Sequence, residues 1–169
     1  MHDLAKGIIF LVAIGCVCGG VLHFANAATK ENIDTNRKLV EQRLLKELVG
    51  PDGSSGFELG KTPSGNCSDG LLLKQVVPGY AGPIEFLLYR GLDPDILRIR
   101  TLEHRETPGI GDFIDSRRDQ YIVEKDAYTA AQWQTLDAVS GATVTSGALN
   151  MALGEALAFV QIQCQSHRG

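Results

Sequence analysis

The sequence lacks the clustered basic or metal-binding side chains that mark many nucleic-acid-binding and metal-binding proteins. The formal net charge is −4, and no run of lysines and arginines offsets it, so the composition argues against nucleic acid as a partner. The four cysteines include no Cys-x-x-Cys pair and the four histidines are scattered, which gives a zinc or iron–sulfur site little support. We expect no bound metal.

The cysteines fall into two pairs with different surroundings. Cys16 and Cys18 lie within an apolar N-terminal run, where cysteine behaves as a small hydrophobic residue. Cys67 and Cys164 lie far apart in the remainder of the chain. A bridge between them is possible in an oxidising compartment, but their spacing does not show that they meet.

The apolar run near the N-terminus is long enough to cross a membrane. Residues 7–22 contain no charged or strongly polar side chain. A membrane-spanning helix needs about 20 apolar residues, so we expect a span over residues 7–28 after a short N-terminal segment, 1–6. The alternative is a signal peptide cleaved after Ala27, which ends an acceptable Ala-x-Ala site. Cations after the span outnumber Lys6 before it, but long domains cross membranes regardless of such charge, so the orientation stays open.

The rest of the chain predicts an α+β domain. Apolar residues at helical spacing predict a stalk helix over residues 29–50, ended by Gly50-Pro51. A Gly/Ser-rich loop then fills residues 51–70, and the globular domain occupies residues 71–169. The expected elements of its small, mostly antiparallel sheet are strands 71–77, 84–90 and 96–102 and a short fourth strand at 121–123, followed by a C-terminal helix over 146–163.

Arg98 and Arg100 alternate with apolar residues in the third expected strand, so we expect one of its faces to be exposed to water.

A first motif of small residues, 106–112, follows that strand directly. The motif's proline fixes φ, and its two glycines let the backbone turn sharply and approach a planar ligand. Taken alone, the motif is an ordinary turn.

A second motif, residues 137–146 (Asp-Ala-Val-Ser-Gly-Ala-Thr-Val-Thr-Ser), lies at the start of the expected final helix. Unpaired N–H groups and the positive end of the helix dipole attract phosphate there. Thr143 places a hydroxyl among these small residues, and Thr145 or Ser146 is a plausible N-cap. No histidine lies nearby to activate a hydrolytic nucleophile, so we expect no catalytic residue. The alternative is a capping loop without a ligand.

Together the two motifs resemble the G subunit of the Rnf electron-transport complex. Residues 103–112 (Glu-His-Arg-Glu-Thr-Pro-Gly-Ile-Gly-Asp), residues 137–146 and the glycine-rich segment 79–84 carry this resemblance. The C subunit of the sodium-translocating NADH:quinone reductase is a relative of that family. His104, just ahead of the Glu-Thr-Pro-Gly segment, favours the Rnf type.

The resemblance implies a membrane-anchored electron-relay subunit of a ferredoxin- and NAD-linked, ion-translocating complex. In that family a separate flavin transferase attaches FMN by a phosphoester to the threonine that is Thr143 here. In the family the domain lies on the periplasmic side of the bacterial inner membrane and the span is retained, which implies an uncleaved anchor and a cytoplasmic segment 1–6 here. Membership of such a complex implies other membrane and peripheral subunits as partners. The further residues expected to contact the cofactor are Ser140, Gly141, Ala142, Thr145, Glu106, Thr107, Gly109 and Ile110.

Two other functions remain open at this point. One is a free-standing flavinylated electron carrier, secreted or membrane-anchored, that serves another reductase. The other is a non-redox periplasmic binding module with its signal peptide removed, a Cys67–Cys164 bridge and only a capping loop at residues 140–146.

Overall fold

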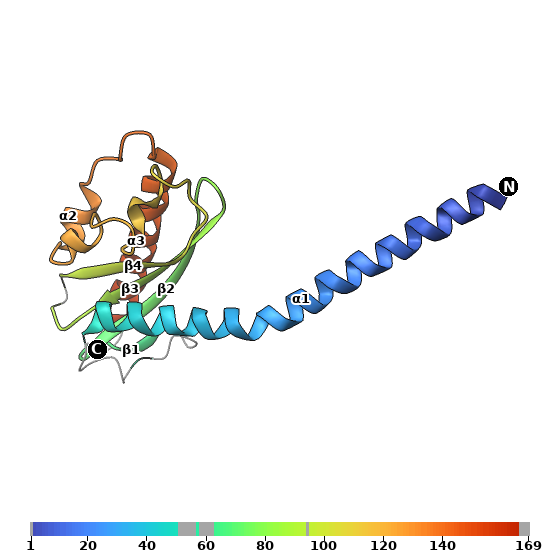
Figure 1. Ribbon diagram of the computed structural model, residues 1–169. Coiled ribbons are helices and arrows are strands. Elements are labelled where there is room, and N and C mark those ends of the chain that lie inside the picture. The colour runs from blue at the N-terminus through green and yellow to red at the C-terminus, as the bar shows by residue number, and fades with distance from the viewer. Residues whose placement is uncertain (1, 51–56, 58–62, 94, 166–169) are drawn as a thin grey trace. The chain divides into compact units, whose positions relative to one another are not determined.

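The computed structural model describes residues 2–50, 57, 63–93 and 95–165 (Figure 1). The chain divides into two compact units, Met1–Val40 and Glu41–Gly169, and each is described by itself.

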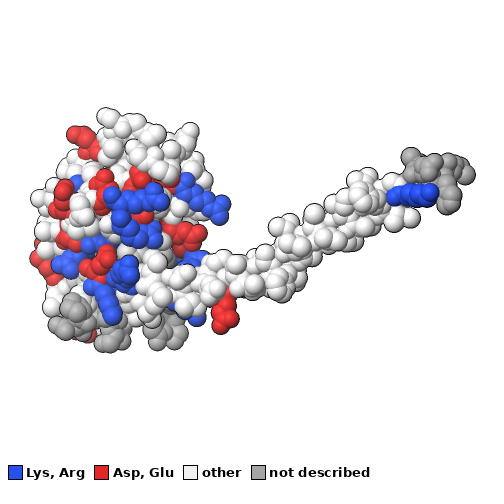
Figure 2. Space-filling model, in the orientation of Figure 1, with Lys and Arg blue, Asp and Glu red and all other residues white. Residues whose placement is uncertain are grey.

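One continuous helix, α1 (His2–Val49), makes up the first unit and extends into the second. The expected span and stalk helix are therefore parts of the same helix. From Lys6 to Val49, α1 is long and apolar enough to cross a membrane by length and composition, and the residues of its apolar window are exposed. No charged residue lies between Lys6 and Lys30, and Figure 2 shows the resulting uncharged stretch of helix surface.

A four-stranded antiparallel sheet forms the centre of the second unit, with its strands in chain order. The registers place Leu73 opposite Leu88 and Leu88 opposite Ile99, so apolar side chains of three strands share one face. The α+β class is confirmed, and the three long strands are confirmed to within one residue at each end. The strands are β1 (Ser64–Asn66), β2 (Gly70–Pro78), β3 (Pro83–Arg90) and β4 (Leu97–Glu103).

The short strand β1 corrects the expectation of an unbroken loop over residues 51–70. It pairs with β2, and the side-chain oxygen of Asn66 accepts the N–H groups of two residues in the turn between them, each at 2.8 Å. Such local bonds are a reason that asparagine favours turns, so this polar composition makes a hairpin. Residues 51–56 and 58–62 of the expected loop lie outside the described part of the chain.

Residues 121–123 form a turn and not the expected fourth strand. They lead into a 3₁₀ turn, η3 (Val123–Lys125). The buried Lys125 stabilises this conformation because its Nζ donates to the carbonyl oxygen of Tyr121 at 2.8 Å and lies 3.4 Å from the centre of the Tyr121 ring. Burial lowers the pKa of the Lys125 ammonium and raises the pKa of the Tyr121 phenol.

Helix α3 (Thr143–Gln165) packs on one face of the sheet and closes the larger core. It also passes the length and composition test for a membrane span, but residues such as Leu153 bury its inner face against the strands. Trp133, from the short helix α2 (Ala130–Gln134), is fully buried in the same core. Its Nε1 donates to the carbonyl oxygen of Leu97 at 2.9 Å, which joins α2 to β4.

The end of α1 that belongs to the second unit covers the opposite face of the sheet. Leu44 and Leu48 are buried there, and Nη1 of Arg98 donates to the carbonyl oxygen of Leu48 at 3.0 Å. Arg100 is also buried, with two hydrogen bonds of 2.6 and 2.7 Å to the Asp126 carboxylate. The expectation that this face is exposed to water is therefore wrong, because sequence alternation does not reveal a helix that covers the polar side of a strand.

A disulfide joins Cys67, in the turn between β1 and β2, to Cys164 near the end of α3. Their Cα atoms lie 5.6 Å apart although their sequence separation is 97. Nη1 of Arg90 donates to the carbonyl oxygen of Cys67 at 3.2 Å and supports the same corner. The bridge therefore fixes the last turns of α3 to the small hairpin.

Candidate functional site

Three segments that are distant in the sequence line one pocket of about 450 Å³ in the second unit. They are the turn between β2 and β3, the turn after β4, and the first residues of α3. The volume lies in the range of pockets that hold cofactors, about 300–1,000 Å³. The lining residues are Tyr80, Glu106, Thr107, Ile110, Gly111, Gly141, Ala142, Thr143, Val144 and Thr145.

Helix α3 begins three residues earlier than expected, at Thr143. The N–H of Ser146 donates to the carbonyl oxygen of Ala142 at 2.9 Å, which is an i to i−4 bond of the first turn. Thr145 and Ser146 are therefore inside the helix, and the expectation that one of them is the N-cap is wrong. The N–H groups of Thr143, Val144 and Thr145 precede that bond, so they have no carbonyl within the helix to accept them.

The hydroxyl groups of this motif differ in what they already bind. The Thr145 hydroxyl is buried and donates to Oε2 of Glu106. The Ser146 hydroxyl donates to the carbonyl oxygen of Ala142 and accepts the N–H of Val139, each at 3.0 Å. Both hydroxyls are therefore occupied by the fold itself.

The two remaining hydroxyls belong to Ser140 and Thr143, and both residues are exposed to solvent. Thr143 lines the pocket, whereas Ser140 is outside the lining set. The Thr143 hydroxyl has no hydrogen-bond partner among the described residues. Among the hydroxyls at this helix start, that of Thr143 therefore both lines the pocket and makes no hydrogen bond to the described residues.

Glu106 connects all three segments that form the pocket. Its side chain is buried; Oε1 accepts the N–H of Ala81 at 3.1 Å, and Oε2 accepts the Thr145 hydroxyl. A Cβ atom at Gly79 would lie 2.5 Å from Oε1, and one at Gly111 would lie 2.9 Å from the Glu106 Cβ. Both glycines therefore leave the room that this carboxylate needs, and Glu106 acts first as a link within the protein.

The turn after β4 is held by its own backbone. The carbonyl oxygen of Thr107 accepts the N–H groups of Ile110 and Gly111 at 3.1 and 2.9 Å. Gly109 adopts φ +76°, a conformation that glycine takes without strain, and its N–H donates to Oδ1 of Asp112 at 2.8 Å. Gly109 lies outside the lining set, so it shapes the turn while Thr107 and Ile110 face the pocket.

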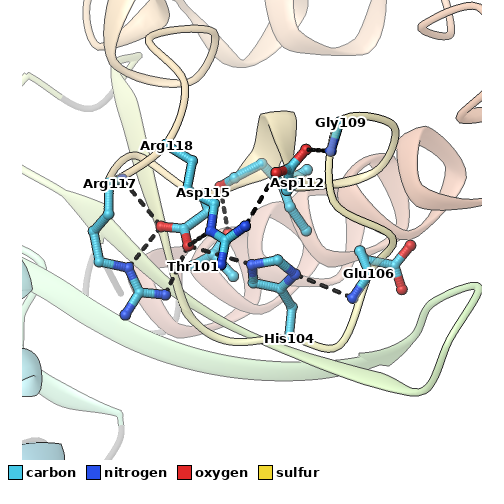
Figure 3. A network of polar contacts seen from close by, with 9 residues as sticks. Thr101, His104, Glu106, Gly109, Asp112, Asp115, Arg117 and Arg118 are labelled. Atoms are coloured by element: carbon cyan, nitrogen blue, oxygen red, sulfur yellow. Dashed lines mark hydrogen bonds and ion pairs between the residues drawn. The ribbon is translucent and has the colours of Figure 1, made fainter.

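His104 and Asp115 support the entrance to that turn, as Figure 3 shows. Nδ1 of His104 accepts the N–H of Glu106 at 3.2 Å, which leaves the hydrogen on Nε2 to face Oδ2 of Asp115 at 3.3 Å. Arg117 donates to both oxygens of Asp115, at 2.7 and 2.9 Å. Burial raises the pKa of the Asp115 carboxyl. The hydrogen bonds and charge of Arg117, with the bond to His104, lower that pKa by more than burial raises it, so it lies below the usual 3.8.

Seven of the nine residues expected to contact a cofactor line this one pocket, and Ser140 and Gly109 do not. Tyr80, Gly111 and Val144 also line it but were not expected. Tyr80 stands between glycines in the segment 79–84, and a large aromatic residue in such a turn is the signal that could have pointed to it. Val144 gives no signal in the sequence, because its exposure depends on where α3 begins.

Residues 79–158 match the FMN-binding domain family, and this range includes all three pocket segments. The chain is also similar to the G subunit of the ion-translocating oxidoreductase complex of Shewanella amazonensis, with 26% identity over 191 residues covering 94% of this chain and 88% of that protein. The corresponding protein of Shewanella baltica is 28% identical over 92% of this chain and 89% of its own length. The chain is therefore similar to these G subunits over most of its length, and part of it matches the FMN-binding domain family.

A shorter match points to the same family. The G subunit of the Haemophilus influenzae complex is 36% identical over 84 residues, which cover 42% of this chain and 40% of that protein. These similarities confirm the resemblance drawn from residues 103–112 and 137–146.

Proposed function

We propose that the chain is an electron-transfer flavoprotein subunit that carries FMN on Thr143 through a phosphoester bond. The match to the FMN-binding domain family supports the cofactor, and the relatives named as G subunits of an oxidoreductase complex support the role. The observation that carries the attachment is the state of the hydroxyls: Thr145 and Ser146 are bonded within the fold, and Thr143 is free on the pocket.

The residues around Thr143 suit a phosphate. The N–H groups at the first turn of α3 and the helix dipole attract negative charge, and Gly141, with φ +81°, lets the backbone approach closely. In the attachment step, Oγ1 of Thr143 loses its proton and forms a bond to the flavin phosphorus of a flavin dinucleotide. The phosphoanhydride bond of that donor breaks, and its other nucleotide leaves as the monophosphate and takes up the proton. A separate flavin transferase supplies this chemistry.

The remaining lining residues suit the rest of the cofactor. The turn of residues 106–111 offers the Thr107 hydroxyl to the edge of the flavin ring and the exposed Ile110 side chain to its face. FMN supplies the redox chemistry when bound, and the protein sets its position, solvent access and surrounding charge. Covalent attachment suits a compartment in which a dissociated flavin would be lost by dilution.

The proposed location is the bacterial inner membrane, with residues 7–28 as an uncleaved span and the globular unit on the periplasmic side. The long uncharged helix surface of α1 supports the span. The Cys67–Cys164 disulfide supports the orientation, because disulfides persist in oxidising compartments and are rare in the cytosol. The proposed partners are the other membrane and peripheral subunits of an Rnf-type complex.

Intact mass spectrometry of the full chain, purified from membranes of cells that contain a flavin transferase, tests this proposal. We expect the mass of the unprocessed chain plus FMN less one water, and ultraviolet fluorescence of the denatured band. Thr143→Ala should remove both signals, whereas the matched control Thr145→Val should keep them. Flavin that survives denaturation in Thr143→Ala would place the ester elsewhere, and a shortened, unmodified chain would refute both attachment and anchor.

A further inference from the structure

Three exposed apolar side chains meet around the mouth of the pocket, each from a different segment. Tyr80 is 73% exposed, and Ile110 and Val144 are each 52% exposed. We call these residues the apolar rim. Large exposed apolar groups gathered at one place on a protein surface mark a binding site for an apolar group.

The backbone around Tyr80 is fixed although its side chain is in water. The N–H of Gly79 donates to the carbonyl oxygen of Gly82 at 2.8 Å, which closes the turn between β2 and β3. The N–H of the next residue, Ala81, donates to Glu106 at 3.1 Å. A rigid backbone that presents an exposed aromatic ring offers a large contact area at low entropic cost.

We propose that Tyr80 packs its ring against the flavin ring of FMN held on Thr143, and so acts as a positioning residue for the redox group. Tyr80 is the aromatic residue among those that line the described pocket. Two aromatic rings in offset or edge contact attract each other beyond the effect of apolar burial. This inference rests on the proposed function, because the phosphoester at Thr143 tethers the flavin beside the rim.

In this arrangement different residues hold the two ends of the cofactor. Thr143 and the first turn of α3 hold the phosphate, while the apolar rim holds the ring and shields one part of it from water. The other occupant that Tyr80 could have is an apolar surface of a partner protein. The two differ because flavin contact alters the spectrum of the isolated chain, whereas a partner contact alters only what the chain binds.

The test compares the full-length wild type with Tyr80→Leu and Tyr80→Phe, each purified in flavinylated form. Two properties are measured: the visible circular dichroism of the flavin, and the ratio of its emission in the folded chain to that in urea. In the wild type, the phenol should quench the excited flavin by giving it an electron, so the ratio is low. Tyr80→Leu should raise the ratio, so that emission from the folded chain approaches that in urea, and should weaken the dichroism, because leucine offers the flavin neither a phenol nor an aromatic face. Tyr80→Phe should keep the dichroism while losing part of the quenching.

Leu92→Ser is the matched control, because Leu92 is similarly exposed, at 77%, but lines a different hollow, beside Val49 and Tyr89. It should leave both flavin signals unchanged. The inference would be overturned if Tyr80→Leu carried its flavin mass but showed the same dichroism and emission ratio as the wild type. It would also be overturned if the only change in Tyr80→Leu were the loss of co-purifying subunits. Absence of flavin mass from the wild type would instead refute the proposed function. Flavin mass lost from Tyr80→Leu but kept in Tyr80→Phe would support the ring contact; loss from both would overturn it.

Discussion

The Thr145 hydroxyl donates its hydrogen to Glu106, a residue 39 positions earlier in the chain. The same carboxylate accepts the backbone N–H of Ala81, so a single buried side chain joins the β2–β3 turn, the turn after β4 and the start of α3. A hydroxyl that is buried and committed in this way is a poor acceptor for a phosphoryl group. The bond therefore shapes the pocket and leaves Thr143 as the pocket-lining hydroxyl of this helix start that has no partner among the described residues.

Thr145→Val should lower the free energy of unfolding without removing the flavin. Valine keeps the shape of threonine but leaves one oxygen of the buried Glu106 carboxylate without its donor, which costs about 1–3 kcal/mol. Urea unfolding of the purified chain, followed by circular dichroism, measures this loss. Thr145→Ser retains the hydroxyl and should recover most of the stability. Loss of covalent flavin from Thr145→Val alone would show that Thr145 takes part in attachment.

Acid should remove the stabilisation that Asp115 provides. Its folded-state pKa lies below the usual 3.8 because the hydrogen bonds and charge of Arg117 outweigh the opposing effect of burial. The folded protein therefore binds fewer protons than the unfolded chain in this range, so the stabilisation is complete above 3.8 and is lost as the pH falls through the lower, folded-state value.

Urea titrations of the wild type and Asp115→Asn at a series of pH values down to about 3 measure this effect. Asp115→Asn should be less stable than the wild type near neutral pH, and the difference should shrink as the pH falls below 3.8. Asp137→Asn, which alters an exposed aspartate, should run parallel to the wild type. A difference between wild type and Asp115→Asn that stays constant with pH would contradict the prediction.

The sequence predicts the long strands and the site motifs well, because both are local. Short apolar runs define β2, β3 and β4, with turn residues at Pro78-Gly79 and at 91–95 between them. The small residues around Thr143 and the turn of residues 106–111 are contiguous, so their chemistry is visible before folding. The apolar pattern does not predict the short helix α2, although Thr129 and Gln132 form a capping box, which is a recognisable helix start.

The parts that could not be predicted depend on contacts between distant segments. The alternation in β4 predicts that Arg100 is exposed, but the end of α1 covers it. The bridge between Cys67 and Cys164 forms because the end of α3 lies beside the β1–β2 turn. The link from Glu106 to Thr145 is of the same kind. Each of these features follows from tertiary packing, which periodicity along the chain does not encode.

Trp133 should be among the most sensitive positions of the core. It is fully buried, and its Nε1 joins α2 to the carbonyl oxygen of Leu97. Trp133→Phe removes this hydrogen bond and part of the ring and should cost about 1–3 kcal/mol, whereas Trp133→Ala leaves a cavity and should cost about 3–5 kcal/mol. Chemical denaturation of both variants, followed by far-ultraviolet circular dichroism, checks the order. Equal stability of the alanine and phenylalanine variants would contradict the packing described for this core.

The disulfide should stabilise the globular unit by several kcal/mol. Cys67 and Cys164 close a loop with a sequence separation of 97 residues, and restricting so long a loop in the unfolded chain corresponds to about 4.7 kcal/mol in the chain-entropy account, with about 2–5 kcal/mol typical of measured removals. Thermal unfolding with and without reductant should therefore show a lower midpoint for the reduced wild type. A Cys67→Ser, Cys164→Ser double variant should match the reduced wild type and should not respond to reductant.

The two cysteines of α1 provide the internal control for this experiment. Cys16 and Cys18 are free, so a Cys16→Ser, Cys18→Ser variant should keep the full response to reductant. Alkylation of the denatured, unreduced wild type should label these two cysteines and leave Cys67 and Cys164 unlabelled if the globular unit folds in an oxidising compartment. Labelling of Cys67 and Cys164 in chains taken directly from the membrane would contradict both the bridge in the cell and the periplasmic orientation that it supports.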